Sequence, residues 1–157
     1  MLDSKYEFVD LGLPSGIKWA DRNVGANSPE EVGLYFAWGE LQGYATPDKS
    51  FDWSNYELCN GTEKTLTKYC NSETYGIVDN LTELELIDDA AHQSESILRY
   101  PSFSNIQELL SNTTTQGVNN YNGSGINGRI FTSKHNGNFI FWPASGGMVG
   151  TAVSGFN

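Results

Sequence analysis

Hydrophobic and polar positions form their clearest pattern near the end of the chain, on either side of Asn-Gly at 136–137. Residues 129–133 and 138–142 are rich in aromatic and β-branched side chains, which is typical of strands. Asn-Gly between two such runs indicates a type I′ hairpin turn, because both central positions of that turn require positive φ. We therefore predict a β-hairpin whose second strand ends at Trp142.

Residues 101–112, PSFSNIQELLSN, have the spacing of an amphipathic helix. Ser104 and Gln107 stand three residues apart, as in a capping box at a helix start. The apolar positions recur at helical intervals: Ile106, Leu109 and Leu110. This segment is the clearest helix of the chain.

Shorter signals fill the rest of the chain. A Pro-Ser-Gly turn at 14–16 separates two short strands, of which the second covers residues 17–20. Ser28 followed by Pro29 indicates a single helical turn. Alternating residues predict a strand at 33–40, and residues 88–92 predict a short helix.

Composition supports one loop-rich domain. The chain has 157 residues, 17 of them glycine, and combines 38% hydrophobic with 13% aromatic residues. Large rings rather than aliphatic layers are expected to hold such a fold together. We predict an α+β fold over residues 1–157, with short strands, one or two short helices and long loops, of which residues 41–80 are the least regular part.

Charge narrows the range of partners. Nine basic residues face nineteen acidic ones, for a net charge of −10. That field repels polyanions, so neither nucleic acid nor an anionic membrane surface is an expected partner. No apolar run is long enough to cross a bilayer, and residues 1–10 lack the pattern of a signal peptide. The chain is expected to be intracellular, a mature fragment, or exported by another route, for instance within a virus particle.

Candidate reactive and metal-binding residues are few. Cys59 and Cys70 either form a bridge over a short loop or stay unlinked, with the unlinked state favoured in a chain without a signal peptide. His92 is expected to close a helix. Asp88 and Asp89 are weak candidates for calcium, but as neighbours on a helix they fit a capped helix start better than a paired acid and base. GSGING at residues 123–128 matches a phosphate-binding pattern only formally, because a strand follows it instead of a helix.

Aromatic residues in loops are the candidate ligand contacts. A ring with one polar edge suits sugar stacking or a protein interface, although each ring alternatively serves to fix a long loop to the core. The candidates for ligand binding are Tyr44, Trp53, Tyr56, Tyr75 and Trp142.

Four segments in order resemble one known family: residues 6–40, 66–92, 99–110 and 125–146. They are similar to the formylglycine-generating-enzyme-like version of the C-type lectin fold. This version is common in gut Bacteroidetes and their phages and also carries the variable proteins of diversity-generating retroelements. The resemblance implies a C-type-lectin-like fold and a display or binding role.

The catalytic branches of that family do not carry over to this chain. The sulfatase-activating branch needs a cysteine pair late in the domain, whereas Cys59 and Cys70 are early. The iron-dependent sulfoxide-synthase branch needs a histidine cluster, which the two distant histidines of this chain cannot supply. Relatives also continue past the Pro-Ala-Ser-Gly block at 143–146 with further loops and strands. This chain stops at Asn157, so the domain is expected to be shortened or to be completed by a partner chain.

The expected function is therefore a non-enzymatic binding or display module. It would be a phage receptor-binding or virion component or a bacterial surface adhesin, located outside the cell, on the cell surface or in a virion. Its partners would be a glycan or a protein on a host or neighbouring cell, with no resident cofactor apart from possible calcium. A structural assembly subunit, forming a homo-oligomer or joining other structural chains, is the alternative. A residual formylglycine-generating-type enzyme, which would need a reactive cysteine, is the remote one.

Overall fold

The computed structural model describes residues 4–45, 52–149 and 152–154. These residues divide into two compact units, and each is treated separately. Unit 1 is described for residues 4–34 and 101–146. Unit 2 is described for residues 35–45, 52–100, 147–149 and 152–154. The prediction of one domain over the whole chain stays a prediction.

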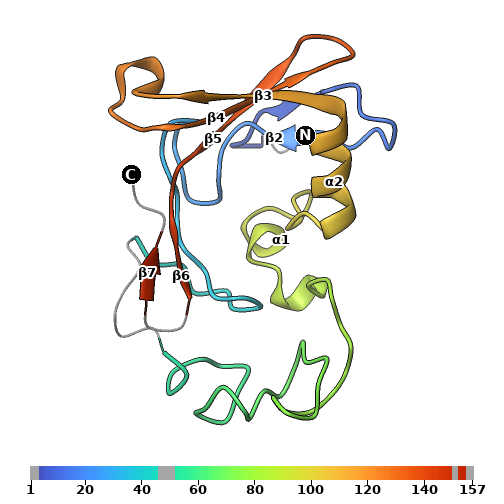
Figure 1. Ribbon diagram of the computed structural model, residues 1–157, viewed down its shortest axis with the longest axis vertical. Coiled ribbons are helices and arrows are strands. Elements are labelled where there is room, and N and C mark those ends of the chain that lie inside the picture. The colour runs from blue at the N-terminus through green and yellow to red at the C-terminus, as the bar shows by residue number, and fades with distance from the viewer. Residues whose placement is uncertain (1–3, 46–51, 150–151, 155–157) are drawn as a thin grey trace. The chain divides into compact units, whose positions relative to one another are not determined.

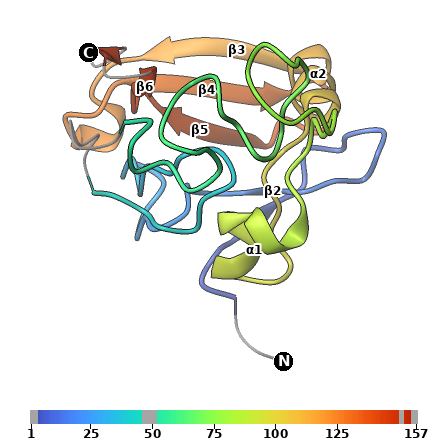
Figure 2. The same ribbon diagram turned by 90° about the horizontal axis from the view of Figure 1, so that it is seen from below.

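A three-stranded antiparallel sheet forms the centre of unit 1 (Figures 1 and 2). Its strands are β3 (Thr113–Val118), β4 (Gly128–Ser133) and β5 (Phe139–Pro143), in the order β3-β4-β5. The predicted hairpin is confirmed as β4 and β5. Strand β3 was not predicted from the sequence, because four of its six residues are exposed and it lacks apolar alternation.

The connection between β4 and β5 differs from the predicted two-residue turn. Ser133 N–H donates to the carbonyl of Asn138 at 2.8 Å, so the loop holds the four residues between them. Within it only Gly137 has positive φ, at 78°. Side chains explain the longer loop. The Ser133 hydroxyl accepts hydrogen bonds from the backbone N–H groups of His135 and Asn136, and the Asn136 side-chain amide donates to the carbonyl of Asp10.

Helix α2 (Phe103–Asn112) confirms the predicted helix, but its N-cap, Ser102, lies two residues earlier than the predicted Ser104. Ser102 accepts from the Asn105 N–H at 3.3 Å, and the Asn105 side chain accepts from the Ser102 N–H at 2.9 Å. The predicted capping box of Ser104 and Gln107 is wrong. Leu109 is fully buried, whereas Leu110 is half exposed, so the apolar stripe of this helix is narrower than the sequence indicated.

The core of unit 1 lies between α2, the sheet and the N-terminal segment. Its buried members come from all three parts: Leu11, Leu13, Leu109, Phe131 and Ile140. Strands β1 (Phe8–Val9) and β2 (Trp19–Ala20) pair antiparallel, and the predicted turn between them is confirmed by the Gly16 N–H to Leu13 carbonyl bond of 2.9 Å. Val9, Trp19 and Trp142 cover the edge of this core.

Regular structure is sparse in unit 2. A 3-10 helix η1 (Leu86–Asp88) leads into α1 (Ala90–Ser94), which confirms a short helix where the sequence predicted one. Strands β6 (Gly147–Val149) and β7 (Ala152–Ser154) form a separate two-stranded sheet. The two cysteines are buried and unlinked.

The strand predicted at 33–40 is wrong. Within it only Tyr35 makes a β-bridge, an isolated one to Tyr44. Gly33 and Gly39 adopt positive φ values of 75° and 78° and turn the backbone out of an extended path. The helical turn predicted at Ser28 reduces to one bond, from the Glu31 N–H to the Ser28 carbonyl.

The described residues thus form a small α+β protein with few short helices and antiparallel sheets. Among these residues no helix is both long enough and apolar enough to cross a membrane.

Candidate functional site

A pocket of about 460 Å³ lies at the end of the unit 1 sheet where β3 and β5 finish and β4 begins. We call it the sheet-end pocket. The strands contribute one part of its wall and the connecting segments the other. Its lining residues are Gly117, Val118, Asn119, Asn127, Gly128, Arg129, Phe131, Trp142, Pro143 and Ala144.

Strand register places an arginine beside a tryptophan in this pocket. Arg129 on β4 is opposite Trp142 on β5 and opposite Gly117 on β3. Side chains two apart on a strand share a face, so Arg129 lies on the same face as Phe131, which is part of the core. The pocket is therefore the outer end of the core-facing side of the sheet.

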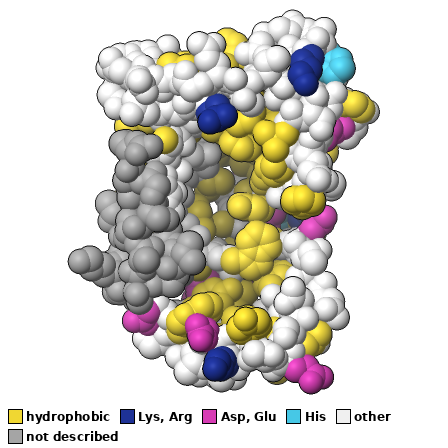
Figure 3. Space-filling view, viewed as in Figure 1, with side chains coloured by type: hydrophobic (Ala, Val, Ile, Leu, Met, Phe, Trp, Pro, Cys, Tyr) yellow, Lys and Arg dark blue, Asp and Glu magenta, His cyan; other side chains and the backbone are white. Residues whose placement is uncertain are grey.

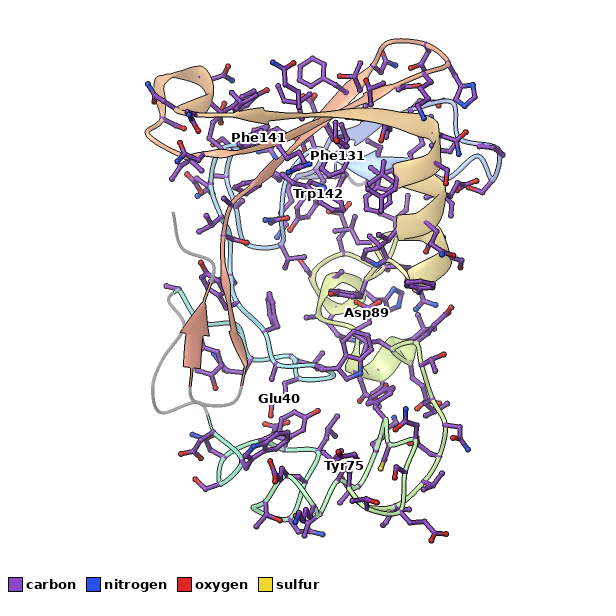
Figure 4. All side chains as sticks on the ribbon, in the orientation of Figure 1. Glu40, Tyr75, Asp89, Phe131, Phe141 and Trp142 are labelled. Carbon is purple, nitrogen blue, oxygen red and sulfur yellow. The ribbon has the colours of Figure 1, made fainter. Side chains whose placement is uncertain are left out.

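Two other aromatic rings pack against Trp142. Its ring centroid is 4.6 Å from that of Phe131 and 5.6 Å from that of Trp19, both in tilted arrangements. Figure 4 shows Phe131 and Trp142 close together beside β4 and β5. Because Trp142 remains half-buried, this packing holds the indole in place while leaving part of it to the pocket.

Gly117, which is opposite Arg129, leaves open space in the pocket. A Cβ added to Gly117 would meet no atom within 4 Å, so the strand opposite Arg129 leaves room there. Gly128 is different, since a Cβ there would lie 2.3 Å from the Trp142 carbonyl oxygen and 2.4 Å from Phe141 Cζ. One glycine provides volume and the other permits close packing of β5.

The loop of residues 119–127 is held by its own side chains. The Asn120 side chain accepts from the Gly125 N–H at 2.6 Å, and the Asn127 side chain accepts from the Asn120 N–H at 3.1 Å. Within the loop is the 3-10 turn η2 (Tyr121–Gly123). These bonds confirm a loop at the GSGING segment and hold Asn127, which lines the pocket, against Asn120.

The pocket carries a positive charge, whereas the chain as a whole has a net negative charge. Arg129 is exposed and makes no ion pair with any described residue, and the one hydrogen bond of its side chain to these residues, to Thr115, is long at 3.5 Å. None of the residues lining the pocket is acidic. On the face drawn in Figure 3 the basic side chains are scattered, and the chain as a whole carries −10. The pocket thus presents an uncompensated guanidinium to a ligand.

The five aromatic residues predicted as ligand contacts are not brought together. Only Trp142 lines the sheet-end pocket, and the other four belong to unit 2. Trp53 and Tyr56 stack edge to face at 5.9 Å, and the Tyr56 hydroxyl donates to the Trp38 carbonyl at 2.7 Å. Tyr75 is half exposed.

Sequence reasoning missed Arg129, Gly117, Asn119 and Asn127. One signal for Arg129 was available, because it alternates with Phe131 and Ser133 in a predicted strand and thus stands on the face expected to be buried. The other three depend on how β3 and the loop before β4 pair, which local patterns do not encode.

Asp88 and Asp89 bind protein donors in unit 2. Asp88 Oδ2 accepts from Lys68 Nζ at 2.5 Å and from the Tyr69 hydroxyl at 2.6 Å. Partial burial raises the pKa of Asp88, but these two hydrogen bonds and the positive charge of Lys68 together lower it by more, so the net pKa lies below its usual value. The described residues contain no group of three or more His, Cys, Asp or Glu side chains placed to hold a metal ion.

Asp89 acts as the N-cap of α1. Its carboxylate, which is almost fully buried, accepts from the N–H groups of Ala91, His92 and Tyr100 at 2.9–3.2 Å. Such capping satisfies the free donors at a helix start. The expectation of a capped helix start is therefore confirmed for Asp89, while Asp88 is held by Lys68 and Tyr69.

Glu40 is a buried acid in unit 2, with 3% of its surface exposed. Burial raises the pKa of Glu40, and the Glu57 N–H, which donates to it at 2.6 Å, lowers it by less. Burial also raises the pKa of Tyr56 to about 12. The Glu40 carboxylate has a local structural partner in the Glu57 backbone.

Comparison of the chain with protein-family models, with curated protein sequences and with solved structures finds no match. Its function is therefore argued from the geometry of these residues.

Proposed function

We propose that the chain is a non-enzymatic binding or display module that takes its ligand in the sheet-end pocket. The setting we propose is extracellular, on a bacterial surface or in a phage particle, with a glycan or protein of a host or neighbouring cell as the ligand. A C-type-lectin-like architecture fits this role. The observation that carries the proposal is the uncompensated Arg129 beside a half-buried Trp142 at an open pocket.

Two features support binding over a purely structural role for this pocket. Its volume falls within the range of about 300–1,000 Å³ typical of small-molecule sites. Its wall is preformed, because Trp142 is packed on two rings and the loop of residues 119–127 is hydrogen-bonded internally. A preformed site loses less conformational entropy when a ligand binds.

The test uses a substitution that fills the pocket. Gly117→Leu places a side chain in free space at normal φ, whereas Gln116→Leu adds the same residue to the opposite face of β3 as a matched control. Wild type and both variants would be applied to a glycan array and to host cells. We expect binding that Gly117→Leu abolishes and Gln116→Leu retains. Absence of binding by folded wild type, or equal loss in both variants, contradicts the proposal.

A structural assembly subunit is the second candidate, favoured by strand β3. This strand is an edge of the sheet, and its residues 114–117 are exposed and uncharged. Edge strands without charge or proline readily pair with strands of other chains. The neighbour would add a fourth strand alongside β3.

Light scattering during size-exclusion chromatography tests the assembly role. The double substitution Thr114→Lys and Gln116→Lys adds charge to the edge strand, and Ser96→Lys adds charge at an exposed position of unit 2 as a control. We expect a wild-type oligomer that the double variant dissociates and the control keeps. A wild-type monomer at every concentration would refute the assembly role.

A further inference from the structure

We infer that the sheet-end pocket recognises an acidic sugar, through a salt bridge from Arg129 to the sugar carboxylate and stacking of the sugar ring on Trp142. This inference rests on the proposed function and specifies the ligand class of the same pocket. It goes beyond the aromatic contacts that the sequence indicated, because Arg129 was not among them.

The guanidinium determines the charge of the ligand. Arginine offers several N–H donors in a planar fork that matches a carboxylate, and it stays charged at every physiological pH. Arg129 makes no ion pair within the described parts of the chain, and no acidic side chain lines the pocket. A ligand carboxylate would therefore be its first close counter-charge.

The charge of the whole chain limits how much negative charge the ligand carries. With a net charge of −10, the protein repels polyanions over distances of about 10 Å at moderate salt. A single carboxylate facing Arg129 gains the local attraction with little of that repulsion. Nucleic acids and polyphosphates carry many adjacent charges and are disfavoured.

The remaining lining residues suit a sugar. Trp142 supplies an aromatic surface of the kind that sugar rings stack on. Asn119 and Asn127 also line the pocket, and side-chain amides both donate and accept hydrogen bonds, as ring hydroxyls require. Because the Asn127 side-chain oxygen already holds the Asn120 N–H, its NH₂ group is the part left to a ligand.

The binding experiment uses matched ligands and matched variants. Oligosaccharides ending in glucuronic acid or in N-acetylneuraminic acid would be titrated into the full chain by calorimetry, together with the methyl ester of each. The ester keeps the ring and hydroxyls and removes the charge. We expect the acid to bind at least tenfold more tightly than its ester, and added salt to narrow the difference.

Protein variants locate the effect. We expect Arg129→Gln to lose at least tenfold in affinity for the acid and to bind acid and ester alike. Arg129→Lys keeps the charge without the planar fork, so we expect an intermediate affinity. Lys64→Gln removes an exposed positive charge in unit 2 and should leave the affinity unchanged. Circular dichroism and thermal unfolding establish that each variant is folded.

Three outcomes overturn the inference. Equal affinity for acid and ester is one, and full acid binding by Arg129→Gln is another. Preference for a peptide with a free C-terminal carboxylate over its amidated form, without binding of the acidic sugars, is the third.

If a neutral glycan or a protein binds instead and Gly117→Leu blocks it, the proposed function stands while the acidic sugar is refuted. If Gly117→Leu changes the binding of no ligand, the binding function of the pocket fails as well.

Discussion

The ring of Tyr121 lies flat on the ring of Phe141, with centroids 3.9 Å apart and planes only 7° from parallel. Tyr121 belongs to the loop before β4, and Phe141 to β5, where it is almost fully buried. This stack joins the loop that carries Asn119 and Asn127 to the face of the sheet opposite Trp142. The pocket wall is thus fixed from the side that the ligand does not touch.

Removal of the Tyr121 ring should therefore loosen the pocket wall. We expect Tyr121→Ala to lower the free energy of unfolding by about 2 kcal/mol, from lost apolar burial and ring stacking. Ligand affinity in the sheet-end pocket should fall as well. Tyr121→Phe keeps the stack and should change stability by less than about 0.5 kcal/mol. Urea denaturation measures both, and equal stability of the two variants would contradict a stabilising stack.

Two glycines of neighbouring strands should respond in opposite ways to alanine. In Gly128→Ala the new Cβ collides with the Trp142 carbonyl and the Phe141 ring, so we expect a loss of about 1–3 kcal/mol. Gly117→Ala adds a Cβ in free space and should be neutral or stabilise by up to about 1 kcal/mol. Thermal unfolding of the pair measures the contrast. Similar melting temperatures would mean that β5 does not pack on Gly128 as described.

Acid should destabilise the chain partly through Asp88. The folded-state pKa of Asp88 lies below its usual value, so the folded protein binds the proton less readily than the unfolded one. The stabilisation is therefore present above the unfolded pKa of about 3.9 and is lost as the pH falls through the folded-state pKa. We expect Asp88→Asn to show a shallower loss of stability than wild type below about pH 4. Urea denaturation across this range tests it, and parallel curves would contradict it.

The ionisation of Glu40 should lower stability as the pH rises, which is opposite to the effect of Asp88. Burial raises its folded-state pKa, so the folded protein binds the proton more readily, and stability falls as the pH rises from about 4.3 through the folded-state pKa. Glu40→Gln keeps an acceptor for the Glu57 N–H and removes the titration. We expect its stability relative to wild type to improve as the pH rises from about 4.3 through the folded-state pKa of Glu40. A difference that stays constant with pH would show that Glu40 has no raised pKa.

Local signals predicted the hairpin of β4 and β5 and helix α2, but they did not predict strand register. A two-residue turn at 136–137 would pair Phe131 with Trp142. The four-residue loop instead pairs Trp142 with Arg129. That shift of two residues keeps every side chain on its face and decides which residue adjoins Trp142 in the pocket. The loop length depends on bonds to Asp10 and Leu11, far away in the sequence.

Edge and loop residues were the least predictable for a related reason. Strand β3 gains its backbone partners from β4 and buries little on either face, so its side chains carry no alternating pattern. Gly117 and Asn119 reach the pocket only through that pairing. Trp142 could be selected from the sequence because a large ring at a strand end is conspicuous by itself.

The start of α2 offers a direct comparison between a cap indicated by sequence spacing and the cap that forms. Ser102 accepts the Asn105 N–H, and Asn105 returns a bond to the Ser102 N–H, whereas Ser104 is exposed. Pro101 precedes Ser102, and a residue in extended conformation is suited to the N-cap position. We expect Ser102→Ala to lower the free energy of unfolding by about 1 kcal/mol and Ser104→Ala to change it by less than about 0.5 kcal/mol. Urea denaturation of the two variants decides between the caps, because a larger loss in Ser104→Ala would mean that the helix begins two residues later.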